Sequence, residues 1–167
     1  IHPIKGDYFH VLQDLAAEHK NKVVMFLGSN IGNMNDTQAQ GFLKALSQSL
    51  KSRDQIILGV DLNKSKDIVL PAYDDSQNIT RDFNLNLLER INRELDANFK
   101  LEQFDHAPEY DEKEGIARSA IVSLIDQEVY IGAIEQSFAF SAGEKINTEI
   151  SRKYDDELIQ ELCNIAG

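Results

Sequence analysis

The fold is decided by the stretch VVMFLGSNIGN, residues 23–33. Its first half is a continuous apolar run, which is typical of a strand covered on both faces of a parallel sheet. Its second half, Gly28 to Asn33, is a loop of small and polar residues. Because ligands of open α/β sheets bind outside the carboxyl ends of the strands, this loop is a candidate binding site.

Strand and helix patterns alternate on both sides of this stretch. Four segments show them, in the order strand, helix, helix, strand: residues 1–5, 8–16, 36–50 and 55–61. Asp36 or Thr37 is expected to cap the second helix. The alternation predicts a doubly wound α/β unit. Its strand ends would place Asp7, residues 28–33 and Asp61 at one edge of the sheet.

The character of the chain changes near residue 60. Residues 1–60 carry 6 basic and 5 acidic side chains, whereas residues 61–167 carry 11 basic and 23 acidic ones. This break predicts two structural units with different surfaces. In the second part we expect a helix, an antiparallel meander of three strands and a final helix: residues 83–95, then 116–124, 128–134 and 136–140, then 154–166.

Composition excludes several classes of protein. The chain has 167 residues and a net charge of -11, which argues against nucleic acid or an anionic membrane surface as a general partner. No apolar run approaches the ~20 residues that span a bilayer. The single Cys163 excludes a disulfide framework within the chain and favours a reducing compartment, the cytoplasm. Because the chain starts at Ile1 and stops at Gly167 directly after a predicted helix, we expect both ends to be cut.

Most candidate sites also have a purely structural interpretation. Residues 28–33 lack the spacing of a dinucleotide fingerprint and the Lys-Ser/Thr of a P-loop, so composition alone favours a turn. Asp74 and Asp75 are ordinary turn residues, and residues 148–151 resemble a solvated strand end. The four histidines have no metal-binding spacing, so no metal site is expected. Cys163 is expected to be a buried packing thiol.

Four segments together resemble one known family, the histidine-specific, S-adenosylmethionine-dependent methyltransferases. They occur in the family's order: FLGSNIGN (26–33), ILGVDLNKSKDIVLPAYDD (57–75), NITRDFNLNLLERINREL (78–95) and INTEISRKY (146–154). The resemblance covers nearly the whole chain. The best-known members of the family make trimethylhistidine in the ergothioneine pathway.

The resemblance implies a fold and an activity. The implied fold is α/β, a Rossmann-like methyltransferase sheet, partial and truncated at both ends, with an inserted α+β substrate domain. Residues 1–62 would form the partial Rossmann domain, residues 63–150 the substrate domain, and residues 151–167 the helix that returns to the Rossmann domain. The implied activity is N-methylation of the α-amine of histidine, with S-adenosyl-L-methionine as cofactor and a small-molecule amino acid as substrate.

The resemblance also assigns roles to individual residues. Asn33 matches the residue that holds the amino and carboxylate groups of the amino acid, and Tyr73 matches a carboxylate-binding tyrosine. Glu149 and Ser151 match the pair that grips the imidazole. On the cofactor side, Asp7 and Tyr8 match the pair next to the adenine, and Gly28 belongs to the strand-end loop assigned to the cofactor. No catalytic residue beyond these positioning residues is implied.

Two departures from the family pattern leave other functions open. Residues 117–120, ARSA, stand where members usually have an Ile-Glu-Met triplet whose methionine lines the substrate pocket. The family's glycine-rich cofactor loop would lie upstream of Ile1, so the chain by itself is expected to be inactive. The alternatives are a methyltransferase of the same family for another amino acid or amine, and a non-catalytic binding module.

Overall fold

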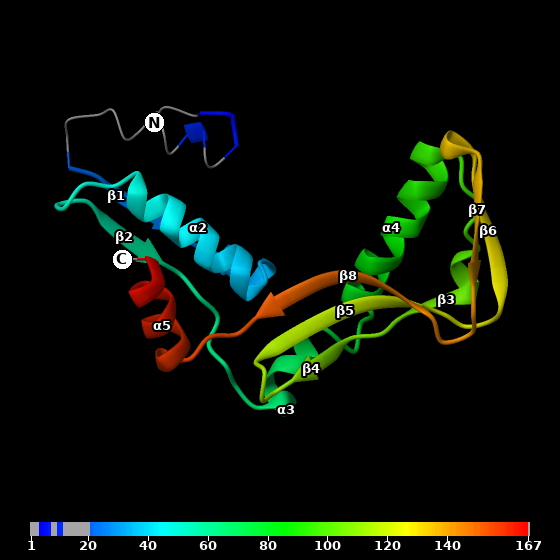
Figure 1. The fold of residues 1–167 in the computed structure, drawn as a ribbon. Helices are drawn as coiled ribbons and strands as arrows, with labels where there is room; N and C mark the ends of the chain where they lie inside the picture. The colour runs from blue at the N-terminus through cyan, green and yellow to red at the C-terminus, as the bar shows by residue number, and fades with distance from the viewer. Residues whose placement is uncertain (1–3, 8–9, 12–20, 167) are drawn as a thin grey trace. The chain divides into compact units, whose positions relative to one another are not determined.

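The computed structural model describes residues 4–7, 10–11 and 21–166 (Figure 1). The chain is a mixed α/β protein that folds into two compact units. One unit contains the residues up to Asn63 and those from Arg152 onward, and the other contains Lys64–Ser151. The chain therefore leaves the first unit once and returns to it.

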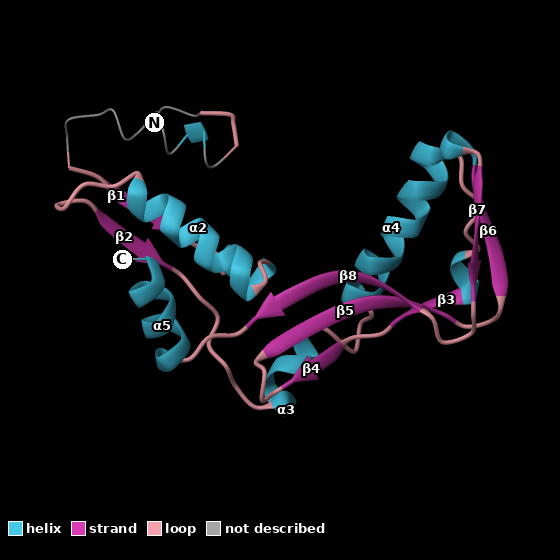
Figure 2. Ribbon diagram, in the orientation of Figure 1, coloured by secondary structure: helices cyan, strands magenta, loops and turns pink. Residues whose placement is uncertain are grey.

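The first unit is built on two parallel strands. They pair in register, with Val23 opposite Gln55 and Phe26 opposite Leu58. Figure 2 shows these strands and the two longer helices of the unit. In chain order the elements are β1 (Val23–Phe26), the 3-10 turn η1 (Asn30–Asn33), α2 (Asp36–Gln48), β2 (Gln55–Leu58) and α5 (Asp156–Ala166). The parallel pair and the helix between its strands confirm the predicted alternation in this part of the chain.

The core of the first unit lies on one face of β1 and β2. Phe42 and Leu46 of α2 and Leu162 of α5 are almost fully buried there, and the rings of Phe26 and Phe42 are 4.6 Å apart. Val23 and Met25 point the other way and are 56% and 61% exposed. Because neighbouring side chains of a strand face opposite sides, the prediction of a strand covered on both faces is met on one face only.

Helix α2 begins at Asp36, one residue earlier than a cap at Asp36 would require. Its N-cap is Asn35, whose side chain accepts a hydrogen bond from the Gln38 backbone N–H at 2.9 Å. The Gln38 side chain accepts one from the Asn35 N–H, also at 2.9 Å, which completes a capping box. The predicted cap at Asp36 or Thr37 was therefore wrong, since reciprocal bonding selected the asparagine.

Two predicted segments near the N-terminus lie largely outside the described residues. Of the strand predicted over residues 1–5, only Ile4 and Lys5 are described, and neither is in a strand. Most of the helix predicted over residues 8–16, including Tyr8, is outside the described ranges.

The second unit is centred on strand β5. In chain order it contains α3 (Lys66–Val69), the turn η2 (Leu70–Ala72), α4 (Ile79–Leu95), η3 (Leu101–Gln103), β3 (Phe104–His106), β4 (Glu109–Asp111), β5 (Ile116–Ser123), β6 (Gln127–Ile131), η4 (Gly132–Ile134), β7 (Gln136–Phe140) and β8 (Lys145–Arg152). Antiparallel β3 and β4 both pair with β5, and β8 pairs with it as well. Strands β6 and β7 form a separate antiparallel hairpin.

The predicted three-strand meander was therefore wrong in its pairing. Its three strands exist, but β5 pairs with β3, β4 and β8 and not with β6. Strands β3 and β4 have three residues each, which is too short for alternation to be recognised in the sequence. The hairpin is tied instead to the end of α4, where the Gly132 N–H donates to the Asp96 carbonyl at 2.9 Å.

Helix α4 packs on the sheet through one buried stripe. Leu88 and Ile121 are fully buried in this core, and Leu85 and Phe104 are nearly so. The rings of Phe99, Phe104 and Phe140 contact one another, with centroids 5.6–6.2 Å apart. This core fixes β3, β5 and α4 with respect to one another, and these elements carry Arg81, Asp105, His106 and Ser119.

Candidate functional site

In the first unit, the loop that follows β1 is joined to the segment that follows β2. Gly28 and Ser29 both have positive φ, 79° and 56°. The Ser29 hydroxyl accepts a hydrogen bond from the Asp61 N–H at 3.0 Å. The predicted neighbours at the carboxyl edge of the strands, the 28–33 loop and Asp61, therefore lie side by side.

The loop is buried at Ile31 and Gly32 and exposed at Gly28 and Asn33. Ile31 is fully buried, and its carbonyl accepts a hydrogen bond from the Tyr154 hydroxyl at 3.3 Å. A Cβ on Gly32 would lie 2.8 Å from the Arg152 carbonyl oxygen, so this position requires glycine. Gly28 and Asn33 are exposed, which leaves the Asn33 side chain on the solvent side of an ordered turn.

The carboxylate of Asp61 already has a partner. The ammonium of Lys153, which is 5% exposed, lies 2.9 Å from it. Burial of a lysine is tolerated when the charge is paired, so this carboxylate has a structural role. Asp7 is exposed, and its carbonyl accepts the Val11 N–H at 3.1 Å; Tyr8, assigned with it to the adenine, lies outside the described residues.

In the second unit, a polar cavity of about 180 Å³ opens beside the start of α4. It is formed by residues from the loop before α4, from α4 itself and from β3. They are Tyr73, Asp74, Asp75, Asn78, Arg81, Asp105 and His106. Of the residues predicted from the sequence, Tyr73 lines this cavity, whereas Glu149 and Ser151 do not.

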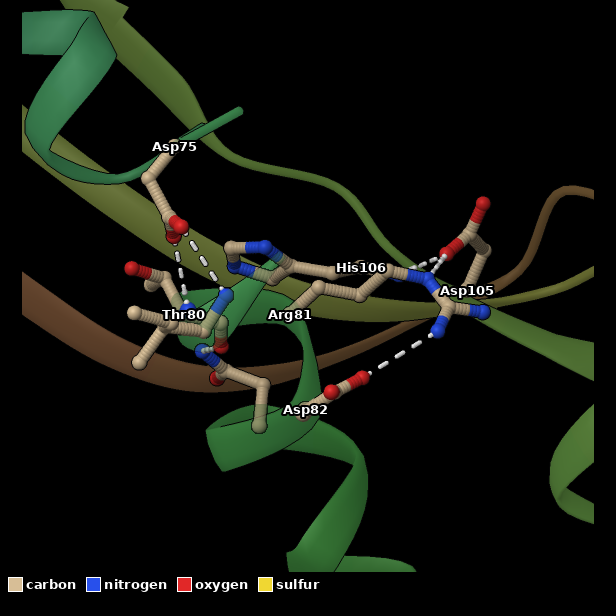
Figure 3. A network of polar contacts seen from close by, with 8 residues as sticks. Asp75, Thr80, Arg81, Asp82, Asp105 and His106 are labelled. Carbon is tan, nitrogen blue, oxygen red and sulfur yellow. Dashed lines mark hydrogen bonds and ion pairs between the residues drawn. The ribbon is translucent and has the colours of Figure 1, made fainter. Parts of the chain in front are cut away.

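Asp75 organises the first turn of α4 (Figure 3). Its carboxylate accepts hydrogen bonds from the backbone N–H groups of Thr80 at 2.8 Å and Ile79 at 2.9 Å. These bonds lower its pKa from 3.8 to about 2. They also explain why α4 starts at Ile79, four residues before the predicted start at Phe83. The interpretation of Asp75 as a turn residue is the one that the structure supports.

Arg81 and Asp105 form an ion pair at the wall of the cavity (Figure 3). The Arg81 Nε lies 2.6 Å from a carboxylate oxygen of Asp105, which also accepts the His106 N–H at 2.9 Å. The hydrogen bond to Asp105 raises the pKa of Arg81. Burial opposes ionisation of Asp105, but the bonds from Arg81 and the His106 N–H outweigh it and lower the pKa of that carboxyl.

His106 is half-buried and is held by a residue of the neighbouring strand. Its Nε2 lies 3.2 Å from the hydroxyl oxygen of Ser119 on β5. Burial lowers the pKa of the imidazole below its usual 6.5, against the opposing effect of Asp74 and Asp105. Nothing in the spacing of the four histidines distinguished His106, because β3 is too short to be recognised and Ser119 is brought to it only by sheet pairing.

The Ser119 position is further fixed from β8 and α4. The Thr148 hydroxyl bridges the Asn84 side-chain oxygen at 2.8 Å and the Ser119 carbonyl at 3.0 Å. Asn84 is 5% exposed and donates to the Thr80 carbonyl at 3.0 Å. Hydrogen bonds therefore link Asp75 to His106 without a gap, through residues of α4, β8 and β5 in turn.

Glu149 and Ser151 lie in the last four residues of β8, so residues 148–151 are at a strand end, as one interpretation of the sequence held. Since successive side chains alternate, both share the face opposite to Thr148. Glu149 is exposed and Ser151 is 8% exposed. Cys163 was predicted to be buried, but it is exposed at a groove of about 510 Å³ between α2, β2 and α5.

The described part of the chain contains neither a metal-binding cluster nor a membrane-spanning helix. Among residues 4–7, 10–11 and 21–166, no three His, Cys, Asp or Glu side chains are grouped so that they could hold a metal ion. Within the same residues, no helix is long and apolar enough to cross a membrane.

Comparison with known proteins points to one family. The model of a family described as histidine-specific methyltransferase, SAM-dependent, matches residues 1–167. The chain is 33% identical over 167 residues to a histidine N-alpha-methyltransferase of Mycobacterium tuberculosis, which covers 100% of the chain and 52% of the relative. It is 36% identical over 143 residues to the Mycolicibacterium smegmatis protein of that name, which covers 85% and 44%.

A fungal relative is more distant. The ergothioneine biosynthesis protein 1 of Schizosaccharomyces pombe is 27% identical over 140 residues, which cover 83% of this chain and 18% of the relative. The chain spans about half the length of the two bacterial relatives that it matches.

Proposed function

Because the chain belongs to the histidine-specific, S-adenosylmethionine-dependent methyltransferase family, we propose that the complete protein methylates the α-amine of histidine. The observation that carries this proposal is the match of the family model over residues 1–167, joined by the two bacterial relatives named for that activity. The substrate is then a small amino acid, and the methyl donor is S-adenosylmethionine.

The two units of the chain fit two different roles in such an enzyme. We propose that the unit with parallel β1 and β2 is part of a Rossmann-like methyltransferase sheet, and that Lys64–Ser151 is an inserted substrate domain. The predicted boundaries, residues 1–62, 63–150 and 151–167, correspond to these roles. The departure of the chain from the first unit and its return at Arg152 support this proposal.

The cofactor side of the proposal rests on Asp7, Tyr8 and Gly28. S-adenosylmethionine would supply a methyl group on a sulfonium, whose carbon a neutral amine can attack while the thioether leaves with the electron pair of the broken C–S bond. Gly28 has a φ of 79° in an exposed loop at the carboxyl edge of the parallel strands, where backbone can approach a ligand closely. The exposed carboxylate of Asp7 is able to accept a hydrogen bond from an exocyclic amine. These features fit the group.

On the substrate side we propose Asn33, Tyr73, Glu149 and Ser151. The exposed Asn33 amide can both accept a hydrogen bond from an amine and donate one to a carboxylate. The Tyr73 phenol can donate to a carboxylate. The exposed carboxylate of Glu149 can accept an imidazole N–H, and the hydroxyl of Ser151 on the same face of β8 can serve the other ring nitrogen. A polar pair of this kind discriminates strongly against side chains that lack those groups.

The chemistry assigns these residues a positioning role. Methyl transfer is an in-line displacement, so rate comes from holding the nucleophile in the right geometry. The nucleophile must also be uncharged, yet an α-amine with a pKa of about 8 is mostly protonated at neutral pH. The protein therefore has to orient the amine and to accept its proton.

The proposal is tested with the complete protein and isotopically labelled S-adenosylmethionine. Mass spectrometry should detect successive methyl additions to histidine, with tryptophan and tyramine as controls. Methylation of another amine, but not histidine, would move the protein to a different substrate within the family. Failure to methylate any of the three, with S-adenosylhomocysteine bound normally, would overturn the assignment of histidine.

A further inference from the structure

The imidazole of His106 has one nitrogen committed and one available. Its Nε2 lies 3.2 Å from the Ser119 hydroxyl oxygen. Among the described residues no protein atom forms a hydrogen bond with its Nδ1. The residue lines the polar cavity of the second unit and is half-buried there. An available ring nitrogen on a fixed imidazole is suited to bind a ligand in that cavity.

The orientation of this ring is fixed by its hydrogen-bond partners. Ser119 is 1% exposed, and its strand is held by the bond from the Thr148 hydroxyl to the Ser119 carbonyl at 3.0 Å. The backbone of His106 is held in turn by Asp105, which accepts its N–H at 2.9 Å. Because both the ring and the backbone are anchored, Nδ1 is presented in one direction.

The charges around the ring favour a cation. The cavity contains three carboxylates against the one guanidinium of Arg81. Asp75 is occupied by backbone N–H groups, and Asp105 is occupied by Arg81. The carboxylate of the exposed Asp74 makes no hydrogen bond with the described residues, and its charge acts on His106. A site with this balance attracts an ammonium group more than a carboxylate.

We propose that this cavity receives the α-ammonium group of the substrate and that Nδ1 of His106 accepts its proton, an inference that rests on the proposed function. An N–H bond of the ammonium breaks, its electron pair stays on the substrate nitrogen, and a new N–H bond forms at Nδ1. The step uses the tautomer in which Nε2–H donates to Ser119. The proton then leaves through the open side of the cavity to solvent.

Two further observations agree with this role. Burial lowers the pKa of His106 below 6.5, so the ring is neutral and able to accept a proton at neutral pH. Asp74, Asp105 and Asp75 stabilise the imidazolium that forms, and Arg81 opposes it. Tyr73, proposed for the carboxylate, lines the same cavity, and an α-amino acid carries its ammonium and carboxylate on one carbon.

The test is the pH dependence of single-turnover methylation of histidine by the complete protein. His106→Gln keeps a hydrogen-bonding side chain but removes the proton acceptor, so we expect a rate about 100-fold lower and the loss of the acidic limb of the profile. Ser119→Ala should lower the rate and displace that limb, because the ring loses its anchor. Ser123→Ala is the matched control, since Ser123 is 1% exposed on the same face of β5 and bonds to the Ile125 carbonyl.

A second measurement uses the unaltered protein and needs no turnover. In ¹⁵N-labelled protein with S-adenosylhomocysteine present, unlabelled histidine should shift the Nδ1 resonance of His106. If histidine is methylated but His106→Gln retains the rate and the profile, or Nδ1 does not respond, the role of His106 is wrong and the proposed function stands. If histidine is not methylated at all, the proposed function itself fails.

Discussion

The loop after β1 and the cavity beside α4 are both polar, but they are assembled differently. The loop is one continuous segment, residues 28–33, and it was identified from the sequence as a candidate site. The cavity takes its residues from three places in the chain, around Tyr73, Arg81 and His106. The first kind of site can be found from local sequence, whereas the second depends on which strands pair. The core beneath the cavity therefore decides whether it exists.

The largest expected effect comes from the core that supports the cavity. Leu88 of α4 is fully buried, so Leu88→Ala should lower the free energy of unfolding by about 2–5 kcal/mol. Leu87→Ala is the matched control, because Leu87 is the next residue in the helix and is 36% exposed. Hydrogen exchange should show the loss in Lys64–Ser151 more than around β1. Equal loss in both units would contradict their description as separate compact units.

A smaller effect is expected at the loop. Gly32→Ala would place a Cβ 2.8 Å from the Arg152 carbonyl oxygen, a backbone atom that cannot move away freely. We expect a loss of about 1–3 kcal/mol in thermal or denaturant unfolding, concentrated in the first unit.

Gly41 in α2 supplies the control for this substitution, because a Cβ there would have no neighbour within 4 Å. Gly41→Ala should stabilise by about 0.5–1 kcal/mol, since alanine favours the helix. If both substitutions had the same effect, the close approach at Gly32 would not constrain the loop.

The smallest expected effect on stability concerns the carboxylate of Asp75, which accepts hydrogen bonds from the first backbone N–H groups of α4. The pKa of Asp75 is lowered from 3.8 to about 2 by backbone N–H groups. Its contribution to stability is therefore present above pH 3.8 and is lost as the pH falls toward 2. Carbon-13 NMR of the carboxyl should report the low pKa directly. In Asp75→Asn this part of the acid dependence should disappear, whereas in Asp74→Asn it should remain.

The parts of the fold that were predicted correctly are those with long local patterns. The apolar runs at β1 and β2 and the helical spacing in α2, α4 and α5 located these elements, although their ends moved by a few residues. Strands β3 and β4 were missed because three residues cannot show alternation. The pairing of β5 was wrong because it depends on those two missed strands.

The same difference between local patterns and strand pairing explains which residues of the candidate site could be predicted from the sequence. Tyr73 was assigned by resemblance to the family and does line the cavity. His106 and Ser119 were not brought together by any sequence signal, since their contact is made across β3 and β5. Asp75 was correctly interpreted as a turn residue, because the short side chain of an aspartate before a helix can accept hydrogen bonds from backbone N–H groups a few residues further on. The exposed Cys163 was misjudged, since helical spacing alone does not tell which neighbours cover a position.

The most direct test of the account is a calorimetric titration of histidine into the complete protein with S-adenosylhomocysteine present. The wild-type protein should bind histidine, and Glu149→Gln should weaken that binding by at least about 10-fold, which is about 1.4 kcal/mol. The affinity for S-adenosylhomocysteine should not change. Equal losses of both affinities, or an unchanged affinity for histidine, would contradict the assignment of Glu149 and of the second unit to the amino acid.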